Sequence, residues 1–148
     1  MLHSMGNYLY KELMLSSIYS GDKLVFDNVV LVAADANSED HPSWVDRIQF
    51  RNRLYITINE NDSALKLSRA KMGSQQKVRL GHFPYGLNSE RAVYVDFTEA
   101  PWVGDSHSYL EDTPLRNAAV KKFFKQALNG EIAAKTLDYD VSRNLHAI

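Results

Sequence analysis

Apolar residues recur along this chain with two different spacings, which predict alternating helices and strands. In the segment 7–20, apolar residues such as Leu9 recur every three or four positions, which predicts a helix that stops before Gly21. The segment 24–34 is apolar at most positions, and from Val29 onward it is apolar on both faces. Continuous apolarity of this kind indicates a buried strand of a parallel sheet, covered by helices on each side.

The rest of the chain predicts further units of the same two kinds. The additional strands fall at 53–58 and 91–97, and the additional helices at 42–50, 64–71, 117–128 and, near the end, 132–136. Ser38 or Asp40 could cap the helix at 42–50. The segments 72–88 and 99–109 carry the glycines, prolines and polar residues of loops. Helices alternate with strands, so the fold class expected is α/β, with a short, mostly parallel three-stranded sheet and flanking helices.

Composition narrows the classes of protein to which the chain can belong. Its 148 residues, 45% hydrophobic and 24% charged, suit one soluble domain over 1–148. A net charge of -1 argues against a nucleic-acid binder. The absence of cysteine excludes disulfides and thiolate sites and fits a reducing, cytoplasmic compartment. No apolar run is long enough to span a membrane, and Met1 leads directly into the first motif, so we expect neither a membrane span nor a signal peptide.

The first residues carry a candidate catalytic turn. His3-Ser4-Met5-Gly6 opens the first helix and has most of the G-x-S-x-G pattern of a nucleophile elbow. In such a turn the Ser4 Oγ projects above the sheet, and the backbone N–H of Met5 points where an oxyanion would form. Gly6 is expected there because a side chain would crowd the backbone crossing. The sequence departs from the pattern at Leu2, which replaces the first glycine, and no strand is predicted ahead of the turn.

Polar residues at the predicted strand ends supply partners for Ser4. Ligands in open parallel sheets lie at the carboxyl ends of the strands. Asp35 follows the first predicted strand, Asp62 follows the second, and His107 follows the third. A serine needs a base to remove its proton during attack, a neutral imidazole can serve, and a carboxylate fixes the imidazole tautomer. The chain order is therefore nucleophile, acid, histidine.

Other interpretations of these residues remain open. Asp62 could simply cap the helix that follows it. Asp35 is the alternative acid, since it ends the neighbouring strand. His82 is a second candidate base, but it precedes the third strand and so falls at the wrong place in the order. The five histidines show no ligand-like spacing, so we expect no metal and no cofactor.

Several segments, taken together and in order, resemble the C-terminal half of an α/β-hydrolase. They are HSMGN at 3–7, VVLVAADAN at 29–37, YITINENDSAL at 55–65, RLG at 79–81 and DSHSYL at 105–110. The resemblance is to a branch of bacterial serine-hydrolase-like proteins of unknown function, esterase- or lipase-like in fold. It implies a partial α/β-hydrolase fold with Ser4 as nucleophile, Asp62 as acid and His107 as base. The family's second oxyanion-hole N–H comes from a loop in the half that this sequence lacks.

Two functions follow as hypotheses. The first is a serine hydrolase of the esterase or acyl-hydrolase type, acting on a small ester-like molecule. The second is a non-catalytic truncated remnant, or half of a split hydrolase, that functions only as part of an oligomer. The strand within 29–34 is apolar on both faces, so we expect a neighbouring strand on each of its edges. In the helix at 7–20, Tyr8, Leu9 and Met14 are candidates for an exposed apolar patch. We therefore expect a homodimer or a complex with the missing N-terminal half.

Overall fold

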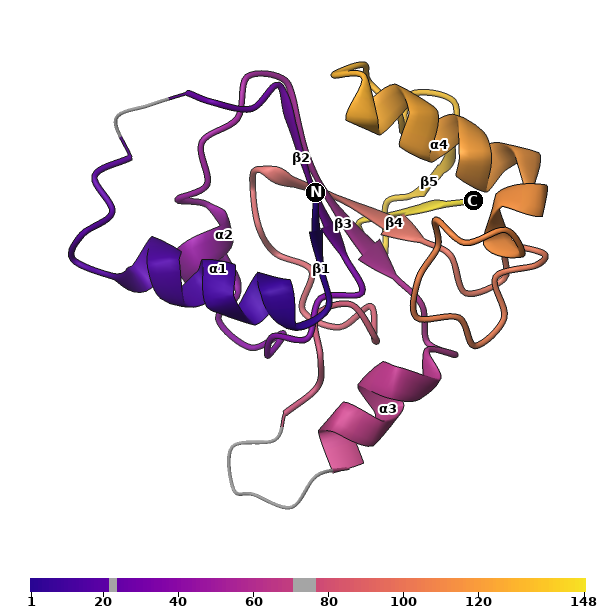
Figure 1. Ribbon diagram of the computed structural model, residues 1–148, viewed down its shortest axis with the longest axis horizontal. Helices are drawn as coiled ribbons and strands as arrows, with labels where there is room; N and C mark the ends of the chain where they lie inside the picture. The colour runs from indigo at the N-terminus through magenta and orange to yellow at the C-terminus, as the bar shows by residue number, and fades with distance from the viewer. Residues whose placement is uncertain (22–23, 71–76) are drawn as a thin grey trace.

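A single six-stranded sheet organises the chain, with strand order β1-β2-β3-β4-β6-β5 (Figure 1). The computed structural model describes residues 1–21, 24–70 and 77–148. The strands are β1 (Leu2–His3), β2 (Asn28–Val32), β3 (Arg53–Ile58), β4 (Ala92–Asp96), β5 (Asp138–Asp140) and β6 (Leu145–Ala147). Strands β1, β2, β3, β4 and β6 pair in parallel in this order, and β5 pairs antiparallel with β6. The predicted α/β class with a mostly parallel sheet is confirmed.

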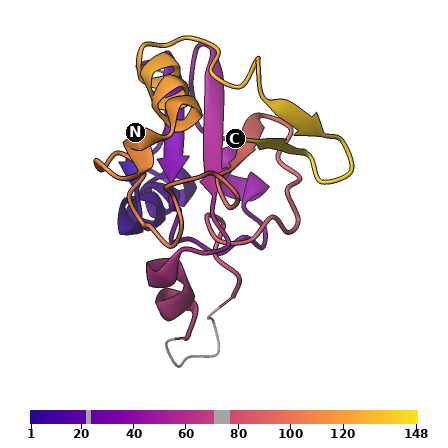
Figure 2. The same ribbon diagram turned by 90° about the vertical axis from the view of Figure 1, so that its right-hand side faces the viewer.

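Helices cover both faces of this sheet. They are α1 (Met5–Leu15), α2 (Pro42–Val45), α3 (Ser63–Ala70) and α4 (Ala118–Leu128), with a short 3-10 helix η1 (Pro114–Arg116) before α4. Helices α1 and α2 lie on one side of the sheet and α4 on the other (Figure 1). Helix α3 follows β3 and lies beyond the carboxyl ends of the strands, away from α4 (Figure 2).

Strand β2 contributes to the core on both of its faces, as its continuous apolarity predicts. Val30 and Val32 pack in the cluster that contains the α4 residues, whereas Val29 and Leu31 pack in the cluster that contains Met14 and Trp44. Successive side chains of a strand point to opposite faces, so an unbroken apolar run belongs to a sheet covered twice. The carboxyl end of β2 is thereby held between two packed layers.

An aromatic cluster anchors the long loop between β4 and α4. Phe97, immediately after β4, stacks on Tyr109 with ring centroids 4.9 Å apart and an interplanar angle of 13°. Phe123 and Phe124 of α4 complete the cluster. Asn117 caps α4 by accepting hydrogen bonds from the backbone N–H groups of the second and third helical residues. The loop that contains His107 is therefore fixed on both sides by buried rings.

The prediction of three strands is wrong, because the sheet has six. Strand β1 lies directly ahead of Ser4, where the sequence analysis expected none, and pairs in parallel with Leu31 and Val32 of β2. Strands of two or three residues, such as β1, β5 and β6, are too short to show a period of two. The short helix expected at 132–136 is also wrong: this segment forms turns that lead into β5.

Several predicted boundaries extend too far. Helix α1 ends at Leu15 because Ser16 has extended backbone, and both the N–H and the Oγ of Ser16 donate to the Leu13 carbonyl. The strand expected at 24–34 begins only at Asn28. The helix expected at 42–50 ends at Val45, and His41, rather than Ser38 or Asp40, occupies its N-cap position. Lys71 and residues 72–76 of the expected loop lie outside the described residues.

Glycine is sterically required at Gly81 but not at Gly6. A Cβ atom at Gly81 would lie 2.3 Å from the Ala34 nitrogen and 2.7 Å from the Ala33 carbonyl carbon. The 79–81 segment can therefore cross the end of β2 only where no side chain intervenes. A Cβ atom at Gly6 would meet no atom within 4 Å. The expectation that a side chain there would crowd the turn is wrong, because this part of α1 faces open space.

Candidate active site

Ser4 occupies a strained turn between β1 and α1. Its φ of 51° and ψ of -125° lie outside the regions that residues other than glycine usually adopt. The Ser4 N–H donates to the Val32 carbonyl at 3.0 Å. The buried Asn7 side chain donates from Nδ2 to the carbonyls of Ser4, at 3.0 Å, and Val32, at 3.1 Å. These bonds hold the strained turn against the end of β2, as strain at functional sites requires.

The side chains of Ser4, His107 and Asp62 form one hydrogen-bonded series. The Ser4 Oγ lies 2.7 Å from His107 Nε2. On the far side of the ring, His107 Nδ1 lies 2.8 Å from Asp62 Oδ2 and 3.0 Å from Oδ1. A neutral His107 that donates from Nδ1 to the carboxylate accepts the Ser4 hydroxyl proton at Nε2. The contacts expected between His107 and both partners are thus present.

Asp62 also caps α3, so its carboxylate makes the contacts that both interpretations of this residue expect. Its Oδ1 accepts a hydrogen bond from the Leu65 N–H at 2.9 Å, while the carboxylate as a whole faces His107. Asp62 is completely buried. The cap therefore fixes the carboxylate in place, and a fixed carboxylate can orient an imidazole.

The carboxylate controls the proton affinity of His107. The hydrogen bond to Asp62 raises the pKa of His107, desolvation opposes this change, and the charges of Asp62 and Asp35 add to the rise. The neutral form, which can act as a base, therefore becomes dominant at a higher pH than for ordinary imidazole. Once His107 takes a proton, Asp62 stabilises the resulting imidazolium.

A buried asparagine supports the loop that contains His107. The Asn59 Nδ2 donates to the carbonyls of Gly104, at 3.0 Å, and Ser106, at 3.3 Å. Its Oδ1 accepts from the Asn61 N–H at 3.0 Å. Asn59 follows β3 directly, so it connects the acid's strand to the base's loop. The sequence alone indicates no role for Asn59 or Asn7 beyond their place within the two motif segments.

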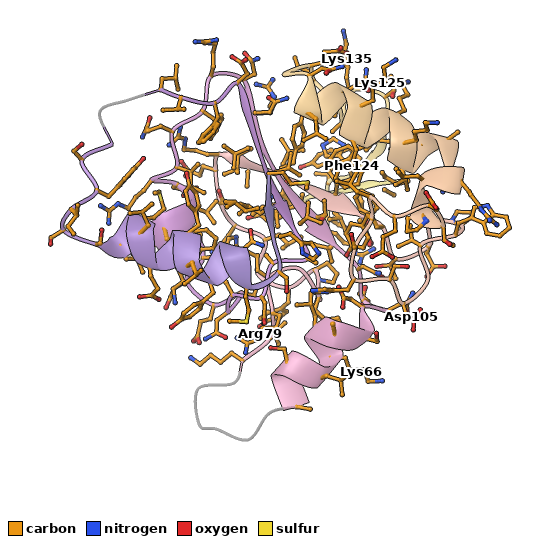
Figure 3. All side chains as sticks on the ribbon, in the orientation of Figure 1. Lys66, Arg79, Asp105, Phe124, Lys125 and Lys135 are labelled. Carbon is orange, nitrogen blue, oxygen red and sulfur yellow. The ribbon has the colours of Figure 1, made fainter. Side chains whose placement is uncertain are left out.

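The alternative acid and base lie elsewhere. Asp35 pairs with the Arg79 guanidinium at 3.0 Å and accepts from Ser68 Oγ at 2.8 Å, rather than contacting His107. His82 is buried and its Nε2 lies 3.0 Å from the Glu60 carbonyl oxygen. Burial lowers the pKa of His82. Arg79 and Asp105 lie at the same end of the molecule as α3 (Figure 3).

The backbone N–H of Met5 is positioned at the start of α1. The first amides of a helix have no acceptor within that helix, and the helix dipole makes this end favourable to negative charge. No acidic residue occupies the first turn of α1. The Met5 N–H can therefore donate to a developing oxyanion beside Ser4.

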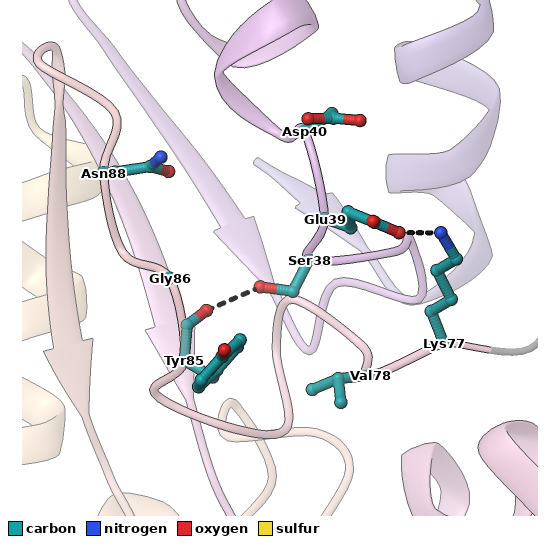
Figure 4. Close-up of a pocket in the computed structure, with 8 residues that line it drawn as sticks. All are labelled: Ser38, Glu39, Asp40, Lys77, Val78, Tyr85, Gly86 and Asn88. Carbon is teal, nitrogen blue, oxygen red and sulfur yellow. Dashed lines mark hydrogen bonds and ion pairs between the residues drawn. The ribbon is translucent and has the colours of Figure 1, made fainter.

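A separate hollow of about 370 Å³ lies beside the loop between β2 and α2 (Figure 4). The Ser38 Oγ donates to the Tyr85 carbonyl at 2.9 Å, and Glu39 forms an ion pair with Lys77. The remaining lining residues are Asp40, Val78, Gly86 and Asn88. Neither Ser4 nor its two partners line this hollow, so it is distinct from the candidate active site.

Comparisons of this chain with protein-family models, with curated proteins and with solved structures found no match. Within residues 1–21, 24–70 and 77–148, no group of three or more histidine, aspartate or glutamate side chains could hold a metal ion. No helix in that part of the chain is long and apolar enough to cross a membrane. The geometry of the site is accordingly the basis for assigning a function.

Proposed function

We propose that this protein is a serine hydrolase of carboxylic esters or related acyl compounds. The observation that carries the proposal is the Ser4 Oγ at 2.7 Å from His107 Nε2, on an imidazole whose Nδ1 faces the buried Asp62 carboxylate. The same three residues take the roles of nucleophile, base and acid that the resemblance to α/β-hydrolases implies. The proposal includes a partial α/β-hydrolase fold for residues 1–148.

The reaction proceeds in two halves. Ser4 Oγ attacks the ester carbonyl carbon while His107 Nε2 takes the hydroxyl proton, and the oxyanion faces the Met5 N–H. The imidazolium then gives this proton to the departing alkoxide, which leaves an acyl-serine. Water attacks the acyl group as His107 takes its proton. Collapse of the second intermediate releases the carboxylic acid and returns the proton to Ser4.

A fluorophosphonate probe tests this proposal, because it reacts with an activated serine and does not require turnover. We expect labelling of the wild-type protein and its loss in Ser4→Ala. Ser17→Ala is the matched control, since Ser17 is exposed just beyond α1, and it should label like the wild type. A wild-type protein that resists the probe, or an unchanged Ser4→Ala, would contradict the assignment.

We predict weak or undetectable turnover of p-nitrophenyl acetate by this chain alone. Loss of one oxyanion donor costs about 10²–10³-fold in rate in a well-studied protease. In α/β-hydrolases, the second N–H of the oxyanion hole comes from a loop that has no counterpart in residues 1–148. Steady-state assays at matched concentrations of wild type and Ser4→Ala measure the difference. Robust turnover that disappears in Ser4→Ala would show that a second donor is already in place.

The second candidate function is that of a chain that acts only within an oligomer. Strand β1 ends the sheet order, so its outer edge has no strand partner among the described residues. Beside it, α1 exposes Met5, Tyr8, Leu9 and Leu13. Met14, expected to be exposed, is instead completely buried. The free edge belongs to β1 rather than to β2, and an open edge flanked by apolar side chains favours association with another chain.

We predict that the protein is a dimer at low micromolar concentration, with an interface of roughly 2,000 Å² or more. Light scattering measures the mass directly. Leu9→Glu should shift the population toward monomer because it places a charge in the apolar patch. Val141→Glu alters another exposed apolar residue, in the turn between β5 and β6, and should leave the mass unchanged. A monomer mass for the wild type would show that this edge is not an interface.

A further inference from the structure

His3 lies between the strand edge and the loop of the candidate base. It is the last residue of β1 and directly precedes Ser4. Neighbouring Leu2 packs against the cluster that contains the α1 and α2 residues. Because side chains alternate along a strand, His3 faces the opposite side of the sheet, where the loop after β4 lies. The sequence alone indicates no separate role for His3.

Two contacts join His3 to His107. The His3 Nε2 lies 2.9 Å from the His107 backbone carbonyl oxygen. The two rings meet edge to face, with centroids 4.8 Å apart and an interplanar angle of 62°. A carbonyl oxygen only accepts hydrogen bonds, so the Nε2 of His3 must be the donor. The contact uses the main chain of His107 and leaves both of its ring nitrogens to Ser4 and Asp62.

This bond couples the backbone positions of nucleophile and base. The Ser4 backbone is fixed to β2, and Asn59 holds the residues on the near side of His107 through the carbonyls of Gly104 and Ser106. The hydrogen bond from His3 also holds the backbone of His107 itself. A misplacement of about 1 Å between reacting groups can cost on the order of 10²-fold in rate. His3 is next to Ser4 and bonds to the His107 carbonyl, so this bond affects the distance between Ser4 Oγ and His107 Nε2.

We propose that His3 is a positioning residue that sets the distance between Ser4 Oγ and His107 Nε2 by donating a hydrogen bond to the His107 carbonyl. The inference rests on the proposed hydrolase function. Among the described residues, no hydrogen bond joins His3 to Asp62 or to the Ser4 hydroxyl, so His3 acts through its bond to the His107 carbonyl and the ring contact beside it.

Two amide substitutions test the donor directly. In His3→Gln the amide nitrogen is as many bonds from Cα as Nε2 is, so it can reach the carbonyl. In His3→Asn the amide is one bond shorter and falls short. The rate of Ser4 labelling by the fluorophosphonate should stay near wild type in His3→Gln and fall by up to roughly 10²-fold in His3→Asn. His3→Leu, which keeps bulk but has no donor, should behave like His3→Asn.

Proton NMR supplies a readout that does not depend on catalysis. The His107 Nδ1–H donated to Asp62 should give a low-field resonance that persists in His3→Gln and broadens or shifts in His3→Asn and His3→Leu. Equal labelling and equal resonances in all three variants would overturn the proposal, as would equal losses in all three. If the wild type resists the probe, the proposed function fails, but the three resonances still decide the role of His3.

Discussion

Replacing Asp62 with Asn should slow the labelling of Ser4 by roughly 10⁴-fold, the size of effect found for the same change in a well-studied serine protease. An asparagine amide can donate to His107 Nδ1, which would move the ring proton to Nε2. The Nε2–H would then face the Ser4 Oγ and could not accept its proton. Asn caps helices about as well as Asp, so the bond to the Leu65 N–H can persist. The change therefore separates the two roles of this residue.

The rate of fluorophosphonate labelling measures this effect, with thermal unfolding as the check on the fold. Asp35→Asn is the matched control, because Asp35 pairs with Arg79 and Ser68 rather than with His107. It should label close to the wild-type rate. Asp62→Ala should lose the labelling and also lower the melting temperature through loss of the cap. A large loss in Asp35→Asn and none in Asp62→Asn would make Asp35 the acid.

Truncation of Phe97 should have the largest effect on stability. Phe97→Ala should lower the free energy of unfolding by about 3–5 kcal/mol, because it deletes a fully buried ring and leaves a cavity. The whole free energy of unfolding of a small protein is only about 5–15 kcal/mol. The deleted ring stacks on Tyr109, two residues after His107, so the loop of the candidate base should loosen with the core.

Urea denaturation followed by circular dichroism measures this loss. Phe97→Leu should cost less than the alanine variant, since it fills part of the cavity. Tyr85→Ala removes a ring that is 76% exposed and should change the free energy of unfolding by no more than about 0.5 kcal/mol. A loss below about 1 kcal/mol in Phe97→Ala would show that the aromatic cluster collapses around the missing ring at little cost.

The elements that the sequence predicted well are those whose own residues decide them. The strand at 53–58 was correct at both ends, and the helix at 117–128 was correct to within one residue. The strand is a run of β-branched and aromatic residues, and the helix carries an apolar stripe with helical spacing. The convergence of Ser4, Asp62 and His107 could be expected from their places after the predicted strands, because parallel strands bring their carboxyl ends to one edge of the sheet.

The elements that the sequence missed are decided by distant partners. Strand β1 has only two residues, and what makes it a strand is its pairing with β2, almost thirty residues later. The Asn59 side chain bonds to carbonyls 45 and 47 residues away, and His3 bonds to one 104 residues away. No local pattern records such contacts. Neither residue type is unusual for its position, so only the fold could reveal their roles.

The two-residue length of β1 has a consequence for how the site opens. Elements at the end of a sheet, held by few hydrogen bonds, open at a lower free energy than the core does. Separation of β1 from β2 would break the bonds of the Ser4 N–H and of the Asn7 side chain to Val32, and would move the nucleophile away from His107 while the rest of the sheet stays intact. The population of molecules with an assembled site is therefore smaller than the folded population. Hydrogen exchange at the Ser4 amide reports the ratio of these two populations.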